Sequence, residues 1–208
     1  MPQFTDLTGL LGAASVVSAI AMTLPGLTRL SAAHKGILLS LVFILPLIPF
    51  GELPLAAYVR GATGDLSIPS LLLLWIGLIN AMCPTIQNKP FALSLLKGRN
   101  ELLMLIAITA LVFYPLSLGI GMFDPYRYGF GCVTFIFALL VIALAAWARE
   151  SGLIVLCLAL ASLAWSIGWY ESNNLLDYLI DPFLAIYALG VITFSMKKHF
   201  FKRPLKET

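Results

Sequence analysis

Three short segments next to apolar runs, and a proline-broken stretch within one run, carry acidic and arginine side chains. Such side chains can bind a cation, clamp an anionic group or transfer a proton. Together the segments contain eight candidate residues: Glu52, Arg60, Asp65, Asp124, Arg127, Glu171, Asp177 and Asp181. The sequence places them on one side of a membrane, as a candidate polar site whose catalytic residues, if any, it does not identify.

The spacing of Asp177 and Asp181 offers the sharpest chemical hypothesis. If Asp177 begins a helix, Asp181 lies one turn further on and shares its face. The two carboxylates would then hold a cation, share a proton, or pair with Arg60 and Arg127. The alternative is that these are ordinary hydrated loops, in which Asp124-Pro125 and Asp181-Pro182 mark turns or helix starts.

Glu52 lies in the most irregular apolar run, which contains Pro46, Pro49 and Pro54. Each proline removes a backbone donor, so the run predicts a broken helix. Broken helices at membrane depth often line a binding cavity. The alternative is a helix that ends near Pro49, with Glu52 hydrated at the outer interface.

The elements that must position these residues are membrane-spanning helices. The chain is 60% hydrophobic and 11% charged, with a mean hydropathy of +0.96, whereas soluble domains average about 25% charged residues. Apolar runs long enough to cross a bilayer recur along the chain. They predict an all-α integral membrane bundle of about seven helices: Leu7–Leu24, Gly36–Tyr58, Ile68–Pro84, Glu101–Gly121, Gly131–Ala148, Gly152–Tyr170 and Leu179–Met196.

The distribution of lysine and arginine predicts the orientation of this bundle. Of the 13 such residues, all except Arg60 and Arg127 fall in every second gap between spans or in the C-terminal tail. Basic loops stay on the cytoplasmic side, so the N-terminus is predicted outside and the C-terminus inside. The N-terminal arm lacks the basic region of a signal peptide, so the first run is expected to be a retained span. Residues 1–196 form the predicted membrane domain and residues 197–208 a basic cytoplasmic tail.

Other residue types exclude several classes of protein. Cys83, Cys132 and Cys157 are scattered, which is typical of packing residues and not of a metal cluster. His34 and His199 are the only histidines, too few for a membrane zinc hydrolase. The last span contains no lysine for a retinal pigment. We therefore expect no cofactor and no metal.

Two functions remain open for a multi-pass protein of the cytoplasmic membrane. One is a small carrier or an accessory subunit of an envelope complex with an acidic outer face. The other is a membrane-embedded enzyme that acts on a lipid-linked or envelope substrate at that face. The predicted partners are the lipid bilayer, anionic headgroups at the basic cytoplasmic rim and other membrane subunits, with no nucleic acid.

Overall fold

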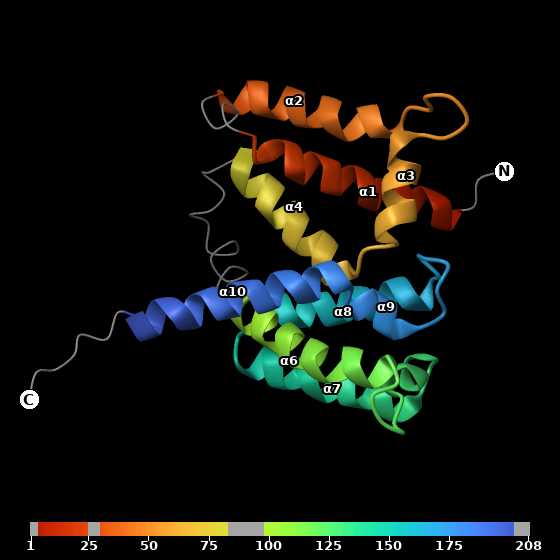
Figure 1. Cartoon of the computed structure of the whole chain (residues 1–208), viewed down its shortest axis with the longest axis vertical. Helices are drawn as coiled ribbons and strands as arrows, with labels where there is room; N and C mark the ends of the chain where they lie inside the picture. The colour runs from red at the N-terminus through yellow and green to blue at the C-terminus, as the bar shows by residue number, and fades with distance from the viewer. Residues whose placement is uncertain (1–3, 25–29, 83–97, 202–208) are drawn as a thin grey trace, which may run out of the picture.

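The structure, a computed structural model, describes residues 4–24, 30–82 and 98–201, and within these ranges every regular element is a helix. Seven longer helices alternate in direction (Figure 1). They are α1 (Phe4–Met22), α2 (Ala32–Ile44), α4 (Ile68–Met82), α6 (Arg99–Ser117), α7 (Val133–Ala148), α8 (Gly152–Ser166) and α10 (Pro182–Phe201). Short elements join them: η2 (Leu45–Leu47), α3 (Leu55–Thr63), η4 (Pro125–Gly129) and α9 (Leu175–Leu179). The predicted all-α class is confirmed.

Because the helices alternate in direction, their connections collect at two opposite ends of the molecule. One end holds the N-terminus of α1 together with α3, η4 and α9, at the right of Figure 1. We call it the acidic end, since it carries Asp6, Asp65, Asp124, Glu171 and Asp177. The other end holds the α7–α8 connection and the C-terminal part of α10. We call it the basic end, after its described cations Lys35, Arg99, Arg149, Lys197 and Lys198.

The helices form two groups. Within the N-terminal group, α1 packs against α2, α3 and α4. Within the C-terminal group, α6 packs against α10, and α8 packs against α7 and α9. Helix α4 joins the groups because it also contacts α8 and α9. Its opposite end leans toward α2, where a Cβ placed on Gly36 would lie 3.7 Å from Met82 Cε. The groups therefore meet through the first turns of α4.

The main core lies inside the C-terminal group. Leu103 of α6, Leu153 and Cys157 of α8 and Ala188 of α10 are almost completely buried there. A second cluster surrounds Tyr178, which stacks on Tyr170 with 5.0 Å between ring centroids. Many other apolar side chains are exposed, Phe137 and Ile186 among them. Among the described residues, α6 is the one helix that is both long and apolar enough to cross a bilayer, and five other apolar helices are shorter.

Several predicted spans have other limits in the structure, and two of these differences concern candidate residues. The run Gly36–Tyr58 is broken, as its prolines predict, but with other limits: α2 begins at Ala32 and ends at Ile44, η2 follows, and Pro49 pairs with Pro54 across a turn before α3. The prolines explain the break, since none can donate to the preceding turn. The last helix begins at Pro182 and not at Leu179. The end of the third span at Pro84, Cys83, and residues 202–208 of the predicted tail lie outside the described residues.

Candidate functional site

Arg60 of α3 is the centre of an ion-pair network at the acidic end. Its Nε lies 2.8 Å from Asp65 Oδ1, its Nη1 3.1 Å from Asp6 Oδ1 and its Nη2 3.1 Å from Glu171 Oε1. Nη2 also donates to Asp65 Oδ2, which makes the Asp65 contact bidentate. These pairs raise the pKa of Arg60 above its usual value, with the hydrogen bond to Asp65 the largest cause. This Arg60 network joins α1, α3 and the α8–α9 connection.

Gly9 makes room for this network. A Cβ built on Gly9 would lie 2.2 Å from Arg60 Nε and 2.5 Å from Asp65 Oδ1. Real Cβ atoms do not approach other atoms so closely, so any larger residue would push the arginine away from α1. In contrast, a Cβ at Gly12, one turn further along α1, would meet only Leu71 Cδ2 at 3.7 Å. Glycine at position 9 therefore leaves the space that the Arg60 guanidinium occupies beside α1.

Asp181 is a buried carboxylate between two helix starts. It is 4% exposed and caps α10, because its Oδ1 accepts from Leu184 N at 2.8 Å. Its Oδ2 accepts from Ser67 N at 3.0 Å and Ser67 Oγ at 2.7 Å, and also from the Ser70 hydroxyl at the start of α4. Both helix dipoles favour a negative charge at this position. These donors satisfy the buried carboxyl group, which makes no ion pair among the described residues.

Asp181 lies inside the bundle and not in an outer loop. The Tyr187 hydroxyl, six residues further along α10, accepts from Arg99 at the first turn of α6. Six residues of helix span about 9 Å. Asp181 therefore lies about 9 Å along the helix axis from Tyr187, beside the middle of α6 and not beyond its end. The hypothesis that Asp177 and Asp181 share a helix face is wrong, because α9 ends at Leu179 and Ile180 is extended.

Asp177 belongs to a separate network. Its Oδ2 accepts from Tyr126 Oη at 2.8 Å and from the Ser172 hydroxyl. Burial, then the bond to Asp177, raises the pKa of Tyr126 to about 12. Asn174 caps α9 and donates to the Tyr126 carbonyl at 2.9 Å. This network fixes η4 to the α8–α9 connection, entirely within the C-terminal group.

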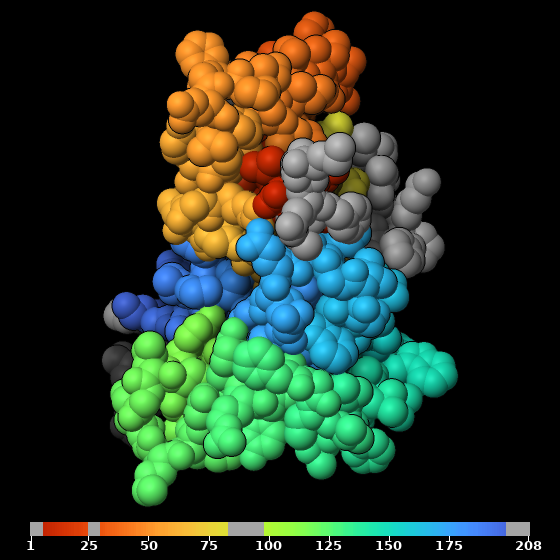
Figure 2. All heavy atoms as spheres, turned by 90° about the vertical axis from the view of Figure 1, so that its right-hand side faces the viewer, coloured from red at the N-terminus to blue at the C-terminus, as the bar shows by residue number. Residues whose placement is uncertain are grey.

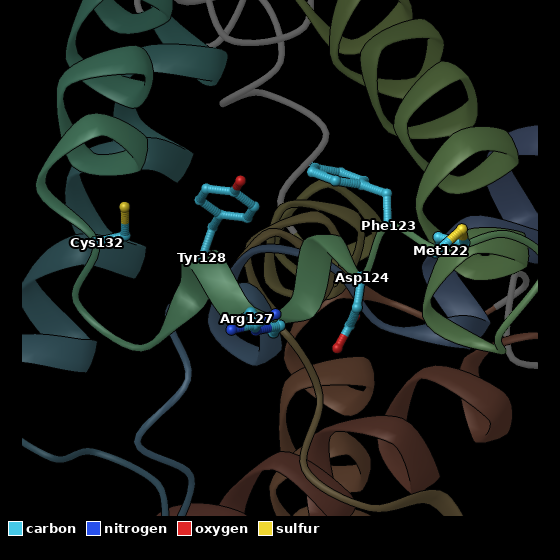
Figure 3. A pocket seen from close by; sticks show the side chains of 6 residues that line it. All are labelled: Met122, Phe123, Asp124, Arg127, Tyr128 and Cys132. Atoms are coloured by element: carbon cyan, nitrogen blue, oxygen red, sulfur yellow. The ribbon is translucent and has the colours of Figure 1, made fainter.

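Arg127 lies on η4 and Asp124 directly before it, and neither makes an ion pair among the described residues. Asp124 Oδ1 accepts from Tyr126 N at 2.9 Å, so its carboxylate caps the turn. Figure 3 shows the rings of Phe123 and Tyr128 on one side of η4 and the two charged side chains toward the other. A shallow cavity of about 340 Å³ is lined by these four residues with Met122 and Cys132.

Glu52 also stays apart from the other candidates. It is exposed in the turn between η2 and α3, which forms one edge of the acidic end in Figure 2. The structure therefore brings together Arg60, Asp65 and Glu171, and separately places Asp177, Asp181, the Asp124–Arg127 turn and Glu52. One helix does end near Pro49, as one of the two alternatives for this run predicted.

A mostly apolar cleft of about 650 Å³ lies between the two helix groups. Its walls come from α1, α3, α4, α6 and α10. At the acidic side it is lined by Thr63, Leu66 and Ser70, and at the basic side by Asn80 and Arg99. Ser70 also donates to Asp181, so the buried carboxylate lies directly behind the acidic side of this central cleft.

Polar contacts join the two groups on the acidic side of the central cleft. Arg60 pairs with Glu171, and Thr8 Oγ1 donates to the Trp169 carbonyl at 2.6 Å. Tyr170 Oη donates to the Leu66 carbonyl at 2.7 Å. Together with the contacts of Asp181 to Ser67 and Ser70, we call these the acidic-end contacts.

Sequence reasoning missed several residues of this arrangement. Asp6, Ser67 and Ser70 are not among its candidate residues. Asp6 is 54 residues from Arg60, and Ser67 is 114 residues from Asp181. Only the Ser67-Ile-Pro-Ser70 sequence carries a local signal, that of a helix start.

Searches against family models, curated proteins and solved structures find no match to this chain. Among the described residues, no group of three or more histidine, cysteine or acidic side chains could hold a metal ion.

Proposed function

We propose that this protein is a small carrier of the cytoplasmic membrane, with about seven crossings, the acidic end outside and the basic end in the cytoplasm. The 60% hydrophobic composition and the crossing length of α6 support a membrane location. The separation of basic from acidic connections supports the orientation. The five shorter apolar helices would cross a locally thinned bilayer, or would be stabilised there by packing against neighbouring helices.

The observation that carries the proposal is a cleft between two helix groups that are joined by polar contacts on its acidic side. Carriers commonly bind their cargo between two such groups, at helices that are interrupted at membrane depth. Here both α4 and α10 begin inside the bundle, after the short helices α3 and α9, and their first turns meet at Asp181. Opening the acidic-end contacts would expose the cleft to the outside.

An enzyme at the outer face has less support. Asp177 and Asp181 accept hydrogen bonds from side chains and helix starts that give them structural roles. Glu52 is exposed and makes no ion pair with Arg60 or Arg127. A general acid or base needs a reacting group within hydrogen-bond reach, and these carboxylates do not face a common cavity.

The proposal can be tested by the side from which the central cleft is reached. In a protein whose native cysteines are replaced, Gly77→Cys places a thiol in the cleft, at a position where an added Cβ meets open space. A membrane-impermeant maleimide should label it in inverted vesicles and not in right-side-out vesicles. Adding Arg60→Ala should permit labelling from the outside as well, and Arg127→Ala should not.

Two results would oppose the carrier. If Arg60→Ala leaves the sidedness unchanged while the protein stays folded, the acidic-end contacts do not gate the cleft. An accessory subunit would then be favoured. If the thiol reacts from the outside in the otherwise unmodified protein, the assigned orientation or the closed acidic side is wrong.

A further inference from the structure

Arg99 places a cation at the basic side of the central cleft. Its Nη2 donates to the Tyr187 hydroxyl, and both residues line the cleft with Asn80. Arg99 is exposed and pairs with no carboxylate among the described residues. The guanidinium thus has donors left for a ligand, and its planar fork matches phosphate geometry.

The rest of the cleft suits a hydrocarbon chain. Along α4 its lining runs from Asn80 to Ser70 and includes Leu73, Leu74 and Ile76. Ten residues of helix span about 15 Å, which is about the depth of one leaflet of a hydrocarbon core of about 30 Å. The volume of about 650 Å³ lies within the roughly 300–1,000 Å³ of ligand pockets.

The cleft also opens sideways, where a lipid would enter. Three of its large hydrophobic lining residues are exposed: Ile20 of α1 at 61%, Phe183 of α10 at 49% and Tyr187 of α10 at 45%. The other described cations of the basic end, Lys35, Arg149, Lys197 and Lys198, lie at the same end of the molecule as Arg99. Basic pockets between helices on the cytoplasmic side bind phospholipid headgroups.

We propose that the central cleft binds an anionic phospholipid of the cytoplasmic leaflet, with its phosphate on Arg99 and one acyl chain along α4 toward Ser70. This inference deepens the proposed function, on which it rests, because it names the class of molecule that the carrier takes. Tyr187 and Asn80 position the headgroup beside the guanidinium. The apolar walls of α1, α4 and α10 cover the chain.

Native mass spectrometry of the full chain in an uncharged detergent tests the site. The probes are phosphatidylglycerol and phosphatidylcholine with identical acyl chains. We expect one phosphatidylglycerol to bind more tightly than phosphatidylcholine. Arg99→Ala should weaken phosphatidylglycerol binding about tenfold, the size expected for lost hydrogen bonds to a charged group. Gly77→Phe, which fills the cleft from a position with open space beside its Cβ, should weaken both lipids.

Arg149→Ala is the matched control, because Arg149 is an exposed cation of the basic end that does not line the cleft. Its affinity for phosphatidylglycerol should stay within about twofold of the unmodified protein, a change of less than about 0.5 kcal/mol. Equal effects of Arg99→Ala and Arg149→Ala would overturn the inference in favour of general attraction to a basic surface. Full binding by Gly77→Phe, or equal binding of the two lipids, would also overturn it.

Folding of each variant is checked by its helical circular dichroism, and Arg99→Gln replaces Arg99→Ala if that variant does not fold. The lipid experiment and the sidedness experiment fail independently. Lipid binding without a change of sidedness in Arg60→Ala would leave a fixed lipid site in an accessory subunit. A change of sidedness without lipid binding would leave a carrier of another cargo.

Discussion

The two arginines of the acidic end have similar neighbours in the sequence and different neighbours in the structure. Arg60 precedes Asp65 by five residues, and Arg127 follows Asp124 by three. Arg60 is 18% exposed and contacts three carboxylates, whereas Arg127 is exposed and makes no ion pair among the described residues. Two of the three Arg60 partners, Asp6 and Glu171, are 54 and 111 residues away. An arginine therefore holds segments of the fold together when carboxylates from distant parts of the chain reach it, and a nearby aspartate alone is not enough.

The largest effect on stability should come from replacing Arg60, and replacing Arg127 is the comparison. Arg60→Ala leaves three carboxylates close together, and we expect it to lower the free energy of unfolding by about 2 kcal/mol, between the values for exposed and buried ion pairs. Arg127→Ala should change it by less than about 0.5 kcal/mol. Unfolding of both variants in the same detergent measures the difference. Equal losses of unfolding free energy in the two variants would show that Arg60 stabilises the fold no more than Arg127 does.

Gly9 sharpens the comparison by disturbing Arg60 without changing any charge. Gly9→Ala should lower the free energy of unfolding by about 1–2 kcal/mol, because its Cβ overlaps the guanidinium. Gly12→Ala in the same helix should be neutral or stabilising by up to about 1 kcal/mol, since alanine favours helix and the site has room. In the Arg60→Ala background the cost of Gly9→Ala should shrink, because the overlapping group is gone. If Gly9→Ala lowers the free energy of unfolding equally in both backgrounds, the loss does not come from overlap with Arg60.

The smallest effect concerns the η4 region, where Tyr126 and not Arg127 makes the connection. Tyr126→Phe removes the hydrogen bond to Asp177 and should cost about 1 kcal/mol at neutral pH. Because the fold raises the pKa of Tyr126 to about 12, it favours the neutral phenol. Its contribution is complete below about pH 10, the ordinary tyrosine value, and is lost as the pH rises through about 12.

Alkaline unfolding of the unmodified protein and of Tyr126→Phe checks this prediction. The stability difference between them should be constant from pH 7 to about 10 and disappear near 12. Arg127→Ala should follow the unmodified protein over the whole range. A difference between Tyr126→Phe and the unmodified protein that stays constant to pH 12 would show that the Tyr126 hydroxyl is not the group responsible.

The all-α class and most helix positions could be predicted from the sequence because they depend on local apolar runs. The limits of α7 and α8 differ from the predicted spans only at one end: Val133 against Gly131 at the start, and Ser166 against Tyr170 at the end. The prolines of the run Gly36–Tyr58 predicted its break, but length and hydropathy do not say where α2 ends or that α3 continues to Thr63.

The candidate site could be predicted only in part. The sequence identified Arg60, Asp65 and Glu171 as residues of one end, and the structure joins them. It also placed Asp181 at the outer face, with Asp181-Pro182 as a turn or helix start in one alternative. Asp181 does precede α10, but it is buried there. The donors that make this burial possible, Ser67 and Ser70, lie at the start of α4, 114 and 111 residues away in the sequence. No local sequence pattern predicts such a contact.

The central claim is that the Arg60 network and its neighbouring contacts hold the two helix groups together at the acidic end. Pulsed electron paramagnetic resonance can measure this through two pairs of spin labels, at Tyr58 and Phe130 for the acidic end and at Ala33 and Arg149 for the basic end, all exposed sites. We predict that Arg60→Ala lengthens the acidic-end distance and shortens the basic-end distance, while Arg127→Ala leaves both unchanged. Unchanged distances in a folded Arg60→Ala protein would contradict the account.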